Sequence, residues 1–158
     1  MQQTLCDGLV VGTPYEDLHD RAHHELAGII GDLGIIDCAA EEMVASGATR
    51  KLFPHGLGHS LGIQVHDVGC KPHSPRAENA FLRTTATVEA GHVFTIEPGC
   101  YFIPSLLAEL RSTSVAKHVS WSLVEELRDF GGIRIEDNIA VTDSGTVNLT
   151  RDNWAASP

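Results

Sequence analysis

The sequence predicts a single α+β domain, with a helical front over residues 1–47 and a strand-rich back over residues 48–158. Apolar side chains recur at helical spacing in the front, whereas short apolar runs and one alternating stretch indicate strands in the back. At 158 residues the chain has the usual length of one domain and is long enough to bury a sizeable core.

Three helical segments are expected in the front. Residues 1–9 resemble the last turns of a helix. The run Thr13–Glu16 (TPYE) predicts a helix start with a capping box and a proline at the first helical position. We expect Asp37 to cap a third, shorter helix that Gly47 closes. The second helix should end near Gly34, with an apolar face made of Leu18, Ala22, Leu26, Ile29, Ile30 and Leu33.

The back alternates strands with helices and one polar loop. Glu97 stands at a strand end, where it faces either a ligand or solvent. In residues 132–141 (GIRIEDNIAV), Arg134 and Glu136 share a face with Asn138, either as part of a site or simply solvated. The opposite face carries Ile133, Ile135, Ile139 and Val141. The expected elements are strands at 92–97, 100–103 and 132–141, helices at 105–110 and 120–128, and a loop at 71–79.

Charge and composition exclude several classes of function. A formal net charge of −10 argues against nucleic acid and anionic membranes as partners, since both need a basic footprint. No apolar run approaches the ~20 residues of a membrane span, and the start lacks the pattern of a signal peptide. The four cysteines show no zinc-type spacing, so we expect reduced thiols in a cytoplasmic protein rather than disulfides.

Residues 55–69 (HGLGHSLGIQVHDVG) concentrate three histidines, four glycines and an aspartate. One such histidine alone is more often structural than catalytic. Together with the carboxylates of Glu97 and Glu136, however, an imidazole makes a suitable site for Mn²⁺, Co²⁺ or Zn²⁺. His59 and His66, separated by a short apolar strand, would supply a ligand and an acid or base. Four glycines would let the backbone turn tightly and approach a ligand: Gly56, Gly58, Gly62 and Gly69.

Four blocks of this sequence resemble the signature motifs of the pita-bread metallopeptidases. They are HGLGHSLGIQVHDVG, FTIEPGCYFIPSLL, FGGIRIEDNIAV and NLTRD, and the likeness runs from about residue 1 to residue 152. The family includes methionine aminopeptidase, aminopeptidase P, prolidase and creatinase. The four motifs are most similar to those of bacterial prolidases (Xaa-Pro dipeptidases) and of organophosphorus acid anhydrolase. The resemblance implies helices packed on a curved, mainly antiparallel sheet, the creatinase/aminopeptidase-like fold.

The resemblance also implies a metal centre and a reaction. His59, Glu97 and Glu136 match metal ligands, and Glu136 matches the glutamate that bridges two divalent ions in a complete member. Manganese is expected, with cobalt or zinc as alternatives. A metal-bound hydroxide would then attack the scissile carbonyl of an Xaa-Pro dipeptide.

Four further residues match functional positions of the family. His66 matches a histidine that contacts substrate and assists proton transfer, and His55 matches one that shapes the pocket near the metals. Arg134 matches an arginine that orders the carboxylate ligands. Arg83 matches a prolidase arginine that binds the free carboxylate of the C-terminal proline, which favours a dipeptidase over an aminopeptidase.

The chain departs from the family in one respect. A complete member has five protein ligands, and two of them are aspartates on a hairpin well upstream of the residue that matches His59. We therefore expect the C-terminal portion of the fold, without the N-terminal domain and the first strands. The chain is a fragment, a short gene product, or one half of a two-chain protein.

This departure leads to three expectations. The chain binds at most one ion and has little activity alone. Its unpaired sheet edge favours a homo-oligomer or another association. The alternative function is that of a truncated, non-catalytic relative with a binding or regulatory role.

Overall fold

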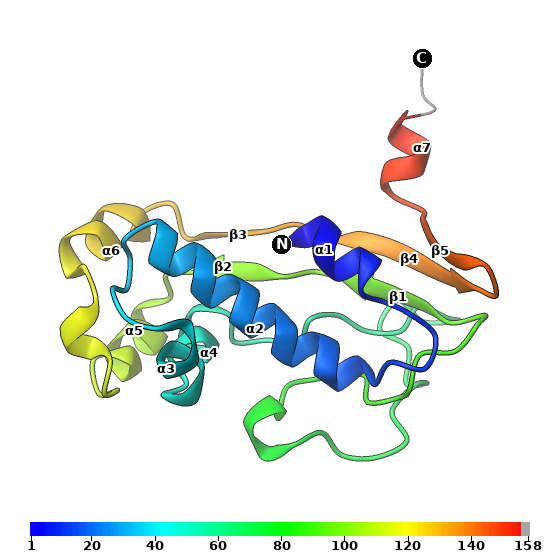
Figure 1. Ribbon diagram of the computed structural model, residues 1–158, viewed down its shortest axis with the longest axis horizontal. Helices are drawn as coiled ribbons and strands as arrows, with labels where there is room; N and C mark the ends of the chain where they lie inside the picture. The colour runs from blue at the N-terminus through cyan, green and yellow to red at the C-terminus, as the bar shows by residue number, and fades with distance from the viewer. Residues whose placement is uncertain (156–158) are drawn as a thin grey trace. The chain divides into compact units, whose positions relative to one another are not determined.

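The computed structural model describes residues 1–155 (Figure 1). Contacts within the chain divide it into two compact units, and each unit combines segments that are distant in the sequence. Among the described residues, no helix is both long and apolar enough to cross a bilayer. The first unit contains Met1–Asp20, His55–Pro98 and the described part of Ile135–Pro158, and the second contains Arg21–Pro54 and Gly99–Arg134.

The first unit is built around an antiparallel sheet in the order β1-β4-β5. Its strands are β1 (Val93–Ile96), β4 (Asp137–Thr142) and β5 (Gly145–Asn148), and Figure 1 shows β1 and β4 side by side. Helix α1 (Gln2–Asp7) packs against β1 and β5. The unit also contains the 3₁₀ turn η1 (Ala77–Asn79) and helix α7 (Arg151–Ala155). The buried apolar residues of this unit include Leu5, Leu9, Tyr15, Phe94, Ile96 and Ile139.

Helix α2 (Tyr15–Asp32) begins at the predicted position, and Gly34 follows its end with a φ of +67°. Four residues of the predicted apolar face are buried, namely Leu18, Ala22, Leu26 and Ile30. Ile29 and Leu33 are 37% and 62% exposed, so the prediction was wrong for them. The buried face of α2 instead includes His19 and His23, which a count of apolar residues omits. Leu33 is exposed because it lies beyond the end of the helix.

Glu16 does not complete the predicted capping box. Its Oε1 accepts hydrogen bonds from the Arg76 backbone N–H at 2.8 Å and from Asn79 Nδ2 at 3.0 Å. The backbone N–H of Thr13 donates to the carbonyl of Val10 instead. Glu16 therefore ties the start of α2 to the loop that contains η1. The capping prediction failed because these partners lie about 60 residues away in the sequence.

The second unit consists of short helices and one two-stranded sheet. The expected helices at 105–110 and 120–128 are present as α5 and α6. Asp37 does not cap α3, because Ala39 is the N-cap residue and the helix start has no side-chain cap hydrogen bond. The backbone N–H of Asp37 donates to the carbonyl of His118. The elements are α3 (Ala40–Ala45), α4 (Ala48–Leu52), β2 (Gly99–Tyr101), α5 (Pro104–Leu110), η2 (Ala116–His118), α6 (Trp121–Arg128) and β3 (Gly132–Arg134), with β2 antiparallel to β3.

The single strand predicted for residues 132–141 is interrupted at Ile135 and Glu136. Its second part is β4, where Ile139 and Val141 are buried as expected. Its first part is β3, where Ile133 is 63% exposed, and Ile135 in the break is 45% exposed. The common apolar face was therefore predicted wrongly for these two residues. β3 pairs only with β2 among residues 1–155, and no described element buries its side chains.

Glu16→Gln tests the contribution of this buried carboxylate to stability. Burial alone would raise the pKa of the Glu16 carboxyl, but the hydrogen bonds from Asn79 and Arg76 and the charge of Arg76 outweigh it and lower the pKa. A lowered folded-state pKa gives stability that is present above the unfolded pKa and is lost as the pH falls through the folded value.

We expect Glu16→Gln to cost about 1 kcal/mol of unfolding free energy at pH 7. The difference should hold above about pH 5 and shrink as the pH falls further. Urea titrations at several pH values measure it. Glu25→Gln, which breaks an i,i+4 pair with Arg21 on the helix surface, is the control and should change stability by less than about 0.5 kcal/mol. A pH-independent effect of Glu16→Gln would contradict the assignment.

Candidate metal centre

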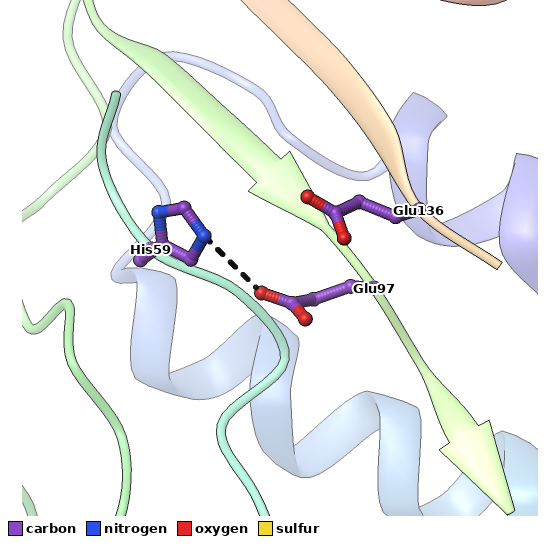
Figure 2. A group of neighbouring side chains, drawn as sticks. All are labelled: His59, Glu97 and Glu136. Carbon is purple, nitrogen blue, oxygen red and sulfur yellow. Dashed lines mark ion pairs between the residues drawn. The ribbon is translucent and has the colours of Figure 1, made fainter. Parts of the chain in front are cut away.

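Three side chains of the first unit converge on one point (Figure 2). His59, Glu97 and Glu136 each direct one ligand atom so that the three atoms lie within 4.8 Å of one another. His59 Nε2 is 3.5 Å from Glu97 Oε1. His59 is 3% exposed and Glu97 is 9% exposed, whereas Glu136 is open to solvent. His59 and Glu97 thus form the buried side of the group, and Glu136 lies on the open side, from which a ligand can enter.

The pairing of β1 with β4 sets the positions of the two carboxylates. Ile96 pairs with Asp137 at the end of the ladder, so Glu97 and Glu136 occupy the next position on each strand. Directly opposed like charges destabilise a strand pair, and burial of a charged carboxylate adds a further cost. A cation between Glu97 and Glu136 would offset both costs, so the arrangement fits a divalent metal.

Thr95 connects the imidazole to the nearer carboxylate. Its Oγ1 accepts the backbone N–H of His59 at 2.9 Å, and it lies 3.2 Å from Glu97 Oε1 as a hydroxyl donor. The Nδ1 of His59 lies 3.0 Å from the carbonyl of Ser60, which suits an Nδ1–H tautomer. That tautomer leaves the Nε2 lone pair directed toward Glu97, as a metal-binding histidine requires.

Gly58 is needed for this connection. A Cβ at Gly58 would lie 2.0 Å from the carbonyl oxygen of Thr95 and 2.6 Å from the Tyr15 hydroxyl. The hydroxyl of Tyr15 donates to the same carbonyl at 2.8 Å. Burial first, and the negative charge of Glu97 second, raise the pKa of Tyr15 well above its ordinary value. Gly58 therefore permits close approach to the protein backbone, and its predicted approach to a ligand stays a prediction.

Sequence reasoning missed both Tyr15 and Thr95. Thr95 precedes Glu97 by two positions on a strand, so both side chains lie on the same face. This spacing in the sequence could have identified Thr95 as a neighbour of Glu97. Tyr15 was recognised only as the start of a helix. Its contact with Thr95 joins residues 80 positions apart, and local patterns give no sign of it.

The apolar strand predicted between His59 and His66 does not form. Ile63 is fully exposed and Val65 is 73% exposed, because residues 62–66 form a series of bends. The Asp67 carboxylate accepts the backbone N–H groups of Gln64 and Gly69, which holds this stretch as a turn. The turn brings His66 beside His59, with a 4.3 Å distance between ring centroids and an edge-on geometry.

The three other predicted site residues are not part of the described cluster. His55 is half-buried, and its Nδ1 lies 2.8 Å from the carbonyl of Gly56. Arg83 follows the buried Leu82 in a loop and is exposed. Arg134 lies on β3 in the second unit, in register with Gly99, and is also exposed.

Comparison with known proteins gives consistent matches. Residues 1–143 match metallopeptidase family M24. The chain is 51% identical over 154 residues to the Xaa-Pro dipeptidase of Marinobacter nauticus, covering 96% of this chain and 36% of that protein. It is 47% identical over 156 residues to the Xaa-Pro dipeptidase of Pseudoalteromonas atlantica, covering 94% and 35%. The chain thus spans about a third of the length of these relatives.

Solved structures agree with the sequence matches. Aminopeptidase P from E. coli with the inhibitor Pro-Leu superposes with a TM-score of 0.69 at 31% identity, covering 96% of this chain and 29% of that one. The zinc-substituted E. coli aminopeptidase P in complex with product gives the same TM-score, identity and coverage.

Gly58→Ala tests the close approach beneath the cluster. The added methyl group must displace the Thr95 backbone, and such overpacking costs about 1–3 kcal/mol of unfolding free energy. Gly28→Ala is the matched control, since its Cβ would meet nothing within 4 Å in helix α2. That control should gain about 0.5–1 kcal/mol. Urea unfolding measures both, and equal stability of the two variants would refute the argument.

Proposed function

Because this chain belongs to metallopeptidase family M24, we propose that it carries the metal-binding part of a metal-dependent Xaa-Pro dipeptidase. The convergence of His59, Glu97 and Glu136 is the observation that carries the proposal. The names of the relatives that are 47% and 51% identical supply the substrate class, an Xaa-Pro dipeptide.

In this proposal His59, Glu97 and Glu136 are the metal ligands. A bound divalent ion would polarise a peptide carbonyl as a Lewis acid and lower the pKa of water toward neutrality. Two carboxylates and one imidazole suit manganese, and cobalt or zinc are alternatives. Thr95 holds the His59 backbone and the Glu97 carboxylate in fixed relation, so little reorganisation is needed when an ion enters.

Substrate contacts are assigned to residues outside the ligand set. His66 contacts the substrate and transfers a proton, and its exposed ring beside His59 supports that role. Arg83 binds the free carboxylate of the proline, for which an exposed guanidinium is suitable. His55 shapes the pocket and Arg134 orders the carboxylates, as the family resemblance implies.

We expect the isolated chain to bind at most one ion and to have little peptidase activity. A cluster of three ligand atoms can hold one ion, and a two-metal site needs further ligands. The same observation favours a second function, that of a non-catalytic relative with a binding or regulatory role. The four free cysteines support a cytoplasmic location in either case.

The ligand assignment is tested by calorimetric titration of Mn²⁺ into the wild type and Glu136→Gln. The wild type should bind about one ion per chain. Glu136→Gln should weaken binding at least tenfold, because the amide has lost the charge that attracts the cation. Glu126→Gln, on the exposed face of α6, removes the same charge elsewhere and should bind as the wild type does. Equal affinities of all three chains would contradict the assignment.

The same preparations separate the two functions. Incubation of the wild type with Mn²⁺ and an Ala-Pro dipeptide should release no proline above a metal-free control. Metal-dependent release that Glu136→Gln abolishes would overturn the expected inactivity and show that the chain is an enzyme by itself.

We also propose that the chain associates through the exposed β3 region. Phe130 and Ile133 are 82% and 63% exposed, and edge strands that expose apolar side chains promote contact with other chains. Sedimentation velocity should therefore show a species larger than the monomer, and Ile133→Lys should shift the distribution toward the monomer. A monomeric wild type at high concentration would rule this association out.

A further inference from the structure

A buried carboxylate lies at the start of β4, next to the metal-ligand position that precedes this strand. Asp137 directly follows Glu136, is 1% exposed, and pairs in register with Ile96, which directly precedes Glu97. The Oδ2 of Asp137 accepts hydrogen bonds from Arg151 Nε at 2.6 Å and Asn148 Nδ2 at 3.1 Å. A buried charge of this kind is costly unless it is paired, so the partners keep Asp137 in place.

These two partners of Asp137 belong to the segment Asn148–Asp152 (NLTRD). This segment supplies no residue of the metal-ligand cluster. This segment is itself ordered by short contacts. Asn148 Oδ1 accepts the backbone N–H groups of Thr150 and Arg151 at 3.1 and 2.9 Å. Thr150 Oγ1 accepts the backbone N–H of Asn138 at 2.9 Å. The segment therefore holds two consecutive residues of β4, directly after Glu136.

Helix α1 holds the opposite strand at the matching place. Gln2 Nε2 donates to the carbonyl oxygen of Ile96 at 2.8 Å, one residue before Glu97. Cys6, also on α1, directs its thiol toward Asp137 Oδ2 at 3.6 Å. Both strands are thus fixed one residue away from the two opposed carboxylates.

We propose that Arg151 is a positioning residue for the metal centre, and that its ion pair with Asp137 holds Glu136 opposite Glu97. The proposal rests on the proposed metal site. Glu136 needs such support because it is exposed and lies in the break between β3 and β4. The backbone hydrogen bond on the other side of Glu136, from the Ile135 N–H to the Pro98 carbonyl, is long at 3.4 Å. Arg151 does not contact the ligand cluster itself, so it acts only through the backbone that follows Glu136.

The experiment compares Arg151→Ala, Arg151→Gln, Arg151→Lys and a control in the full chain. Arg128→Ala is the matched control, since Arg128 pairs with Glu125 at 2.9 Å and is 45% exposed, against 39% for Arg151. Two properties are measured well below the unfolding temperature. The first is Mn²⁺ affinity by calorimetry. The second is the ¹³C carboxyl signal of Glu136 in metal-free protein, assigned by its absence from Glu136→Gln.

We expect Arg151→Ala to weaken Mn²⁺ binding roughly tenfold, the usual effect of removing an outer support of a metal site. The Glu136 carboxyl signal should shift or broaden in the same variant. Arg151→Lys, which keeps the charge, should recover most of the affinity, and Arg128→Ala should leave both properties unchanged. If Arg151→Ala does not fold, Arg151→Gln, which keeps a donor without the charge, takes its place with the same expectation.

A loss of stability with unchanged affinity and an unchanged Glu136 signal would overturn the inference, because Arg151 would then be only structural. If the wild type binds no Mn²⁺, the proposed metal site fails instead. The ¹³C carboxyl signal of Glu136 in metal-free protein then decides the inference about Arg151. A changed signal in Arg151→Ala would support the inference, and an unchanged signal would overturn it.

Discussion

The antiparallel pairing of β1 with β4 is the interaction on which the rest of the structure depends. It joins residues about 40 positions apart and places Glu97 and Glu136 at opposed positions beyond the last ladder pair. The same strand β1 carries Thr95, whose hydroxyl accepts the His59 backbone N–H and thereby brings the imidazole to the carboxylates. Without this pairing, two like charges would not be held together, and the group would have no reason to attract a cation.

The polar groups beneath the cluster form a consistent arrangement. Tyr15 donates a hydrogen bond to the Thr95 carbonyl, and Gly58 leaves room for that carbonyl. The Thr95 hydroxyl donates to Glu97, and the buried Asp137 is held at the start of β4 by Arg151. All of these groups lie in the first unit of the chain. The exposed carboxylate of Glu136 and the exposed ring of His66 are the parts of the site that solvent can reach. A buried frame with an open face suits the metal-assisted hydrolysis that we propose.

Patterns in the sequence predicted the features that depend on neighbouring residues. The start of α2, helices α5 and α6, and strand β1 lie close to their expected places, and the family match and structural neighbours confirm the predicted α+β pita-bread fold. Features set by distant contacts were not predicted. Glu16 bonds to Arg76 instead of capping α2, and the strand at 132–141 breaks at Glu136. In these two cases the deciding partner or geometry is not visible in a local window. The turn before His66 is local, because the Asp67 carboxylate accepts the N–H groups of Gln64 and Gly69, but the apolar alternation suggested a strand there.

The central claim is that the opposed carboxylates and His59 form one cation site. X-ray diffraction at the manganese absorption edge, from crystals grown with Mn²⁺, tests it most directly. The account predicts one anomalous peak within bonding distance of His59 Nε2 and of both the Glu97 and Glu136 carboxylates. A map with no peak among these three side chains, or with the ion held by other residues, would contradict it.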